Sequence, residues 1–243
     1  MRFGFSCVLA GSLLLTLSVP RASLAQSALP RFGAEAKAST LGIGIEGATA
    51  VTHRSNLRFG FNVFDYHKTI DKDGIEYDAT LNLRSLQLMY DQYIAGGFHV
   101  SPGLLVYNGN KVDATASVAP GGSFSLGGKP YYSNQSNPIR GSGNLKLGKA
   151  APMILLGVGN PLPRSGRHFT VNFDAGVVFQ GSPKTTLNLT GTACTISPSA
   201  GCLNAGADST IQSNVRAEQE KLNDDLKPFK YYPVLSLGFG WRF

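Results

Sequence analysis

The sequence predicts an all-β fold, specifically an up-and-down antiparallel transmembrane β-barrel, and three observations favour it. Charged residues make up only 15% of the 243-residue chain, whereas soluble domains usually carry about 25%. Glycine is abundant, with 29 residues, as expected for short strands and turns. Apolar residues also alternate with small or polar ones along many segments, and this period of two is the period of a β-strand.

The first 25 residues predict a cleaved signal peptide. Arg2 precedes an apolar run from Val8 to Val19, and Ser23-Leu24-Ala25 has the small-x-small pattern of a cleavage site. The run is shorter than the stretch of about 20 apolar residues that a spanning helix needs. We therefore expect 1–25 to be removed and 26–243 to form a single β-barrel domain. No long apolar run follows, which excludes a helical inner-membrane protein.

Seven strands can be placed directly from the alternation. They cover roughly 39–51, 55–67, 77–93, 98–110, 142–158, 168–182 and 229–243. Single-chain barrels of this kind have an even number of strands, so Phe32–Lys37 is expected to supply the eighth, through a tight hairpin near Ala38–Thr40. A barrel of ten strands is the alternative if Val112–Val118 and Ser123–Tyr131 also enter the membrane.

Long connections alternate with short turns, as long extracellular loops and short periplasmic turns do in membrane barrels. The long ones lie near 67–78, 108–140 and 182–228. In the last of them, apolar residues recur at helical spacing from Ile211 to Leu226, after Asp208 or Ser209 as an N-cap. We expect one short helix there, and its narrow apolar stripe favours a helix packed on the outer rim over one that plugs the barrel.

The last strand carries the clearest signal. Large residues occupy one of its faces, namely Leu235, Leu237, Phe239, Trp241 and Phe243. The segment Tyr231–Phe243 resembles the C-terminal assembly signal of bacterial outer-membrane barrels, a terminal Phe preceded by aromatic or apolar residues at alternate positions. The chain is similar in kind to the small OmpA/OmpW-like barrels. The resemblance implies a place in the cell outer membrane of a Gram-negative bacterium, contact with its lipid and lipopolysaccharide, and insertion by the barrel-assembly machinery.

The residues expected to face inward predict a filled lumen. They are Arg58, Asn62, Phe64, Met89, Asp91, Asn172, Asp174, Gln180 and Arg242. Isolated charges away from water are costly, so Arg58 and Arg242 are expected to form a lumen network with Asp91 and Asp174. Eight strands enclose only enough space for side chains or one small ligand. We therefore expect the barrel to conduct poorly.

Two cysteines, Cys194 and Cys202, remain after the signal peptide. An even pair in an exported protein predicts a disulfide.

The sequence contains matches to cofactor- and metal-binding motifs, but they lack the surrounding elements or ligands that these motifs require. Gly42–Gly47 spells GxGxxG inside a strand, and Gly143–Lys149 spells GxxxxGK before Ala150, where a phosphate loop needs Ser or Thr. The acidic cluster at Asp71–Glu76 lacks the ligand number that calcium requires. Basic residues do not cluster, so nucleic acid is not an expected partner. We predict no cofactor and no metal.

The histidines do not indicate a catalytic site. His53, His99 and His168 fall at short turns, which predicts scattered polar residues on the periplasmic rim. His67, with Asp65 two residues away, is near the outer rim but has no obvious serine partner. The GxSxG, SxxK and HExxH motifs are absent.

Three classes of function remain. The expected one is a structural or surface-interaction role presented by the extracellular loops, with no enzymatic activity and the oligomeric state left open. The alternatives are a narrow OmpW-like channel for small or apolar solutes and an outer-membrane lipid hydrolase or acyltransferase.

Overall fold

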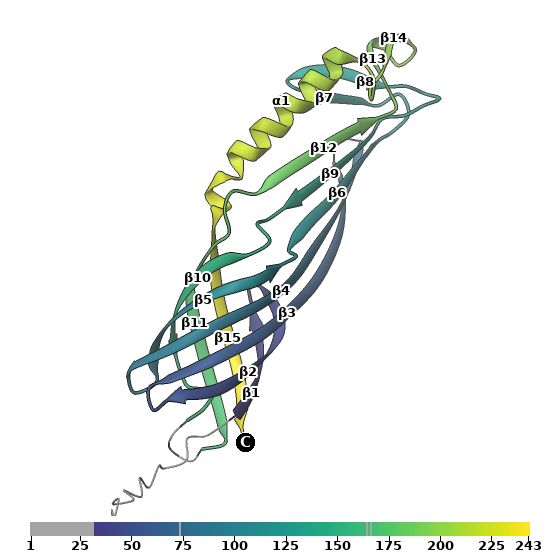
Figure 1. Cartoon of the computed structure of the whole chain (residues 1–243). Coiled ribbons are helices and arrows are strands. Elements are labelled where there is room, and N and C mark those ends of the chain that lie inside the picture. The colour runs from purple at the N-terminus through teal and green to yellow at the C-terminus, as the bar shows by residue number, and fades with distance from the viewer. Residues whose placement is uncertain (1–31, 73, 164, 166) are drawn as a thin grey trace, which may run out of the picture.

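A computed structural model describes residues 32–72, 74–163, 165 and 167–243, so the predicted signal peptide lies outside the described residues. Eight of the described strands pair in a closed ring, and every neighbouring pair is antiparallel. In ring order they are β1 (Phe32–Ser39), β2 (Gly42–Thr52), β3 (Ser55–Lys72), β4 (Ile75–Ala95), β5 (Phe98–Asn108), β10 (Ala151–Val158), β11 (Phe169–Phe179) and β15 (Tyr231–Arg242). The ring forms the lower part of the molecule in Figure 1.

The ring strands bury one face and expose the other, as the alternation predicts. On β15, the residues from Leu235 to Trp241 alternate between exposed large side chains and buried small ones. The outward faces of β2, β3, β10 and β11 are likewise apolar and exposed, with Ile43, Ile45, Phe59, Phe61, Ile154, Leu156, Val171 and Phe173. None of the described helices is both long and apolar enough to cross a membrane.

One predicted strand is two separate elements. The range 142–158 divides into β9 (Arg140–Lys146) and β10, and only β10 belongs to the ring. The chain bends between them at Lys149 and Ala150, just after Gly148, where a Cβ atom would lie 2.7 Å from the carbonyl oxygen of Gln180. Glycine permits this close approach, which lets the chain pass from one sheet region to the other.

The predicted long loops consist largely of strands, which corrects the sequence prediction. The 67–78 loop is a hairpin, because β3 and β4 stay paired from Ser55↔Gln92 to Lys72↔Ile75. Three further strands extend the sheet beside β4: β6 (Lys111–Val118), β9 and β12 (Lys184–Thr190). We call this five-stranded region, made of the upper parts of β3 and β4 with β6, β9 and β12, the extension (Figure 1).

The far end of the extension carries a second, four-stranded sheet. Its strands are β7 (Ser123–Leu126), β8 (Lys129–Ser133), β13 (Thr192–Ser197) and β14 (Ala200–Asn204). The ten-stranded alternative places Val112–Val118 and Ser123–Tyr131 in the membrane, but these segments form β6, β7 and most of β8, which lie outside the closed ring. Indeed, β6 pairs with residues 75–82 of β4, whereas the ring partner β5 pairs with residues 85–95.

Helix α1 (Ser209–Asp225) forms where the sequence predicts it. Asp208 is its N-cap, and its carboxylate accepts hydrogen bonds from the backbone N–H groups of Thr210 and Ile211. The helix follows the free edge of β12, where Asn223 Oδ1 and Gln219 Oε1 accept from the backbone N–H groups of Thr185 and Leu187 at 2.8 and 3.0 Å. The helix thus protects an edge strand from unwanted pairing. The short 3-10 helix η1 (Lys227–Lys230) then leads into β15.

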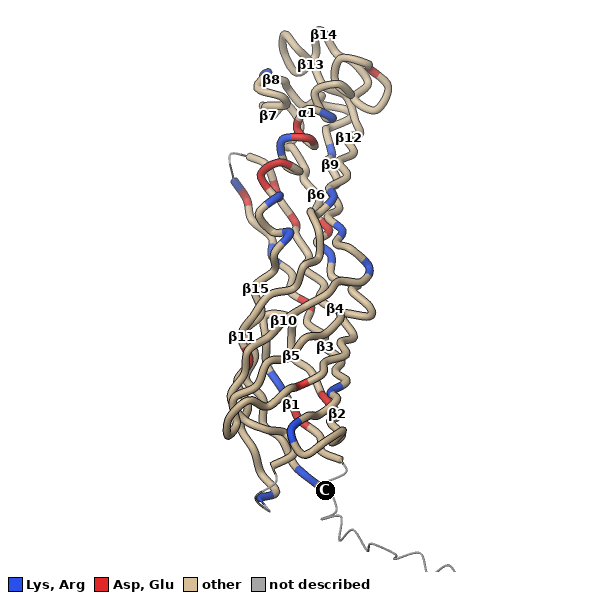
Figure 2. Tube along the Cα trace, turned by 60° about the vertical axis from the view of Figure 1, so that its left-hand side comes forward, with Lys and Arg blue, Asp and Glu red and all other residues tan. Residues whose placement is uncertain are grey.

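Charged residues are unevenly distributed over the two regions. The tube along the ring strands is mostly tan in Figure 2, whereas α1 carries closely spaced acidic and basic residues. This distribution is the one expected if the outward face of the ring contacts an apolar medium and the extension contacts water.

Candidate functional site

Arg58 is the centre of a buried ionic network inside the ring. The residue lies on β3 and is 1% exposed. Its Nε donates to Asp91 of β4 at 2.9 Å, and its Nη1 lies 3.0 Å from both Glu46 Oε1 of β2 and Asp174 Oδ2 of β11. Carboxylates from three other strands therefore surround one guanidinium group, whose several donors suit this arrangement.

A second set of contacts completes the network. Lys37 Nζ lies 2.8 Å from Glu46 Oε2, and Gln87 donates to the same oxygen at 2.7 Å. Ser101 donates to Asp91 at 2.6 Å, and Asn172 donates to Glu35. Each of these carboxylates is hydrogen-bonded, which offsets much of the cost of burying a charge.

Arg242 does not join this network, although the sequence predicts that it does. It is the last residue of β15, and its Nη1 donates to the backbone oxygen of Pro163 at 2.9 Å. Among the described residues it forms no salt bridge. Its position at the end of the strand puts it at the rim, away from Asp91 and Asp174.

His99 belongs to the network, and its predicted position on the rim is wrong. Its side chain is fully buried, and its Nε2 lies 2.9 Å from Asp174 Oδ1. The neighbouring strand makes room for the ring, because a Cβ on Gly157 would lie 2.3 Å from this Nε2. His53 and His168 are exposed, and His168 stacks on Trp241 with ring centroids 5.7 Å apart.

Sequence reasoning missed four ionisable network residues, and all four had a visible signal in the alternation. Glu35 and Lys37 alternate with alanines on β1, and Glu46 alternates with isoleucines on β2. Extending the inward parity to these two strands would have found them. His99 shares the inward parity of Ser101 and Leu105 on β5, and the space for its ring comes from Gly157 of a strand distant in sequence.

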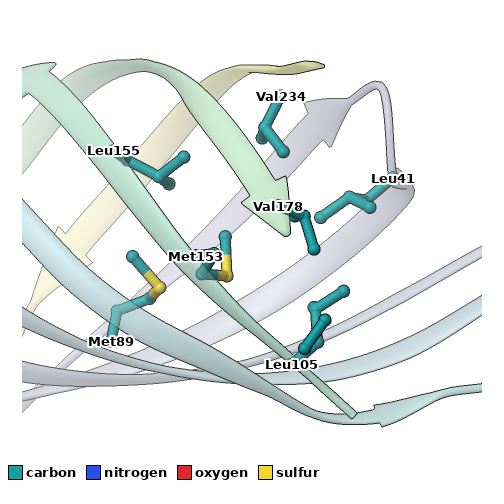
Figure 3. Close-up of a cluster of buried hydrophobic side chains, with 8 residues drawn as sticks. Leu41, Met89, Leu105, Met153, Leu155, Val178 and Val234 are labelled. Carbon is teal, nitrogen blue, oxygen red and sulfur yellow. The ribbon is translucent and has the colours of Figure 1, made fainter. Parts of the chain in front are cut away.

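An apolar layer fills the ring above this network, on the side of the extension. It consists of Leu41, Met89, Leu105, Ala151, Met153, Leu155, Val178 and Val234, all at most 3% exposed (Figure 3). We call this cluster the plug. Tyr232 packs against it from the extension side. The sequence predicts a mainly polar interior, and of its inward set only Met89 lies in the plug.

The remaining predicted inward residues occupy different levels of the molecule. Asn62 is buried and donates to Ser85 and Gln87. Gln180 is buried and donates to the carbonyl of Phe229 at 3.0 Å. Phe64 lies above the ring and is 40% exposed.

The inner face of the extension is apolar from the ring to its far end. The register of β3 and β4 has no shift, so the parity that points into the ring continues upward. The residues on this face include Ile75, Tyr77, Ala79, Leu81 and Leu83 on β4, and Val112, Ala114, Ala116 and Val118 on β6. We call this inner face the trough.

Two cavities lie along the trough. The upper one, of about 350 Å³, is lined by trough residues together with Phe124 and Leu126 of β7 and Val215 of α1. The lower one, of about 290 Å³, reaches from Leu83 to Tyr232 and is therefore adjacent to the plug. Helix α1 closes the trough on the β12 side.

The β3 side of the trough is open. Tyr66, Ile70 and Tyr77 are 51%, 46% and 41% exposed, although they share the face that lines the cavities. A contiguous apolar surface of this kind is typical of a binding site.

The outer face of the extension is polar. On β6, the Lys111 ammonium lies 2.7 Å from Asp113, and together with the Asn144 amide it holds the pKa of Asp113 below its ordinary value. A polar outer face and an apolar inner face show that only the inner face is suited to an apolar ligand.

His67 also lies on the polar outer face. Its Nε2 is 3.1 Å from Asp78 Oδ1 and its Nδ1 is 3.0 Å from Thr80 Oγ1, whereas Asp65 pairs with Arg84 instead. The side chains of His67, Asp78 and Asp65 are 58%, 42% and 50% exposed. The described residues contain no group of His, Cys, Asp and Glu side chains that could hold a metal ion.

A disulfide joins Cys194 and Cys202, as the cysteine pair predicts. It links β13 to β14 in the four-stranded sheet, at the end farthest from the ring. The Asn134 amide also donates to the carbonyl of Pro198, which holds the loop before β9 against this hairpin.

We expect a variant with both cysteines changed to serine to fold its ring normally. Closing a loop this short contributes at most about 3 kcal/mol, and the ring shares no strand with the four-stranded sheet. Proteolysis of the purified protein should then show faster cleavage only within 192–204. Free thiols in the unreduced parent protein, or loss of the ring in the variant, would contradict this expectation.

Comparisons with known proteins give the fold. The crystal structure of Acinetobacter baumannii CarO matches with a TM-score of 0.55 and 22% identity, over 87% of this chain and 97% of CarO. The structure of CarO2 from the same organism matches with a TM-score of 0.57 and 21% identity, over 89% of this chain and all of CarO2. No family model and no curated protein sequence matches the chain. The chain thus has the fold of an outer-membrane β-barrel protein, without a specific tie to the OmpA or OmpW groups.

Proposed function

We propose that the protein is an integral β-barrel of the outer membrane whose ring is a closed anchor and whose extension carries its function. In this proposal the extension lies outside the cell and has a structural or surface-interaction role. The apolar outward face of the ring supports the membrane location. A closed ring also leaves no unpaired strand edge, which is the condition for strands in lipid.

The observation that carries this proposal is the filling of the ring by two stacked layers. The ionic network occupies the lower level, with Arg58 and Asp91 at most 1% exposed, and the plug occupies the upper level. Side chains that pair across a narrow lumen leave no wide aqueous path. A general porin needs more strands and a water-filled interior.

A second candidate is a narrow path for small apolar solutes. The observation in its favour is that the lower cavity of the trough ends on Tyr232, directly against the plug. Two of the plug residues, Met89 and Met153, have flexible side chains that can repack. On this alternative the plug would open transiently to a solute that arrives along the trough.

Planar-bilayer recordings and solute-uptake assays can test both candidates. We expect the parent protein to show no large, long-lived openings. A plug variant with Met89, Leu105 and Met153 changed to alanine is compared with a control that changes Leu104, Ile154 and Leu156, which lie on the outward face of the same ring.

The outcomes separate the two roles. Equal, low uptake in the parent, the plug variant and the control supports the anchor. Faster uptake of apolar solutes in the plug variant alone supports the path. Steady openings that pass ordinary salts and sugars in the parent protein would overturn both.

A further inference from the structure

We propose that the trough binds the hydrocarbon chain of a single-chain anionic amphiphile, a fatty acid, with its carboxylate at Lys68. The inference rests on the proposed function, because it places the ligand on the extracellular part of a closed barrel. Beyond the proposed function, it names the class of ligand, the surface that holds the hydrocarbon chain and the residue that binds the carboxylate.

The floor of the trough has the shape of a groove because its middle rows are built from small residues. One row in register runs Lys68, Ala79, Ala114, Gly143 and Leu187 across the five strands. Larger side chains lie at both sides of the floor, Tyr66 and Ile70 on β3 and Leu187 and Leu189 on β12. A Cβ added at Gly141, in the next row, would make an ordinary contact at 3.6 Å with Ala116, and one at Gly143 would lie 3.2 Å from the end of the flexible Leu187 side chain, so the glycines keep the floor low.

The dimensions fit an extended chain. From Leu83 to Ile75 the floor follows eight residue steps of β4, which is about 26 Å at about 3.3 Å per residue. The cavities of about 350 and 290 Å³ lie at the two ends of this line. Lys68 lies beside Ala79, halfway along this line. A chain whose carboxylate is held there follows about 13 Å of floor, at about 3.3 Å per residue, and ends in the upper cavity, which Ala114 and Ala116 line.

The chemistry of the walls favours a hydrocarbon over a peptide. The floor strands β4, β6 and β9 have neighbours on both sides, so their backbone groups are already paired in the sheet. A peptide in the trough would leave its own amide groups without partners, and such groups are costly to bury. A hydrocarbon chain has no such groups.

Lys68 supplies the complement to an anionic head group. By register it lies on the inner face between Tyr66 and Ile70, beside Ala79. It forms no salt bridge with the described residues, whereas Lys111 and Lys227 pair with Asp113 and Asp224. Lys72 shares this face by register, beside Ile75 at the end of β3, whereas Lys68 adjoins the row of small residues on the floor. An unpaired ammonium beside an apolar groove is the arrangement that an acid with a long chain requires.

Photo-crosslinking of the full protein in lipid nanodiscs, free of detergent, tests this proposal. The probes are palmitic acid and its alcohol, each with a photoreactive diazirine in the chain, and mass spectrometry locates the label. We expect saturable labelling by the acid at trough residues. Labelling of outward ring residues, which contact the bilayer, serves as the unsaturable reference.

Two matched pairs of variants assign the site. Ala116→Phe fills the floor and should abolish saturable labelling, whereas Ser117→Phe, on the outer face of the same strand, should leave it unchanged. Lys68→Gln should reduce labelling by the acid to the level of the alcohol, whereas Lys146→Gln, on the outer face, should not.

Each result decides a different part of the inference. Absence of saturable labelling at the trough of the parent protein would overturn the site. Equal labelling by acid and alcohol in the parent protein would overturn the role of Lys68. Both failures would leave the closed barrel intact, because heat-modifiable migration and the lack of conductance report on the ring independently.

Discussion

Replacing Arg58 with methionine is expected to lower the free energy of unfolding by about 3–5 kcal/mol, the usual cost of breaking a buried ion pair from one side. The variant leaves Glu46, Asp91 and Asp174 buried around a side chain that donates no hydrogen bond. Methionine roughly preserves the volume, so the loss reports charge rather than packing. Denaturant unfolding of the barrel, followed by heat-modifiable migration on gels, measures the change.

A matched control uses a pair at the surface. Arg84 lies 3.6 Å from Asp65, and both side chains are at least half exposed. Exposed pairs contribute about 0–1 kcal/mol, so Arg84→Met should have little effect. Neutralising the acids together with Arg58→Met should restore part of the stability, since no uncompensated charge would then remain. A loss as small for Arg58 as for Arg84 would contradict a buried network.

The alternation of residues predicted which face of a ring strand points inward, but not how high along the ring a residue lies. Arg58 and Arg242 share the inward parity. Arg58 is the fourth residue of β3 and meets three acids, whereas Arg242 is the last residue of β15 and donates to a rim carbonyl. Height depends on the stagger between strands, which is a property of pairing and not of local sequence.

The extension was read as loops for a related reason. On β6 and β9 the inner positions are Ala114, Ala116, Gly141 and Gly143, which contrast little in hydrophobicity with their polar neighbours. Without that contrast the period of two is weak. These segments are strands because β4 continues upward and offers them a partner. The small residues that hid the strands are also those that form the floor of the trough.

The plug could not be predicted because no single segment of the sequence contains a pattern that indicates it. Its eight residues come from five strands and the turn at Leu41. Four of the five strands place a polar residue at the lower level and an apolar one above it, as Asp174 and Val178 do on β11, whereas the inward residues of β10 are all apolar or glycine. Only when the strands are in register do these two levels become layers, and the layers give the barrel its closed interior.

Changing both Phe239 and Trp241 to aspartate is expected to abolish assembly in the outer membrane. Both side chains lie on the outward face of β15 and are 50% and 53% exposed, and Phe239 packs near Phe169 with ring centroids 6.5 Å apart. A basic residue on a lipid face costs about 2–4 kcal/mol at mid-bilayer, and an acid costs less. Two acids near the end of β15 cost less than that, but they also remove two aromatic residues of the C-terminal assembly pattern, and both effects together should be enough to prevent assembly. Deleting Phe243 should impair assembly without adding any charge, because it removes the terminal aromatic residue of the same face.

Two controls separate membrane placement from general damage to the strand. Changing Phe239 and Trp241 to leucine keeps the face apolar and should preserve assembly. Changing Thr186 and Asn188 of β12 to aspartate places the same charges on the polar face of the extension and should be tolerated, because that face is in water. Fractionation of cells and heat-modifiable migration report the outcome. Normal amounts of folded aspartate variant in the outer membrane would show that the exposed apolar face of the ring is not a lipid-facing surface, and the proposed anchor would then have to be abandoned.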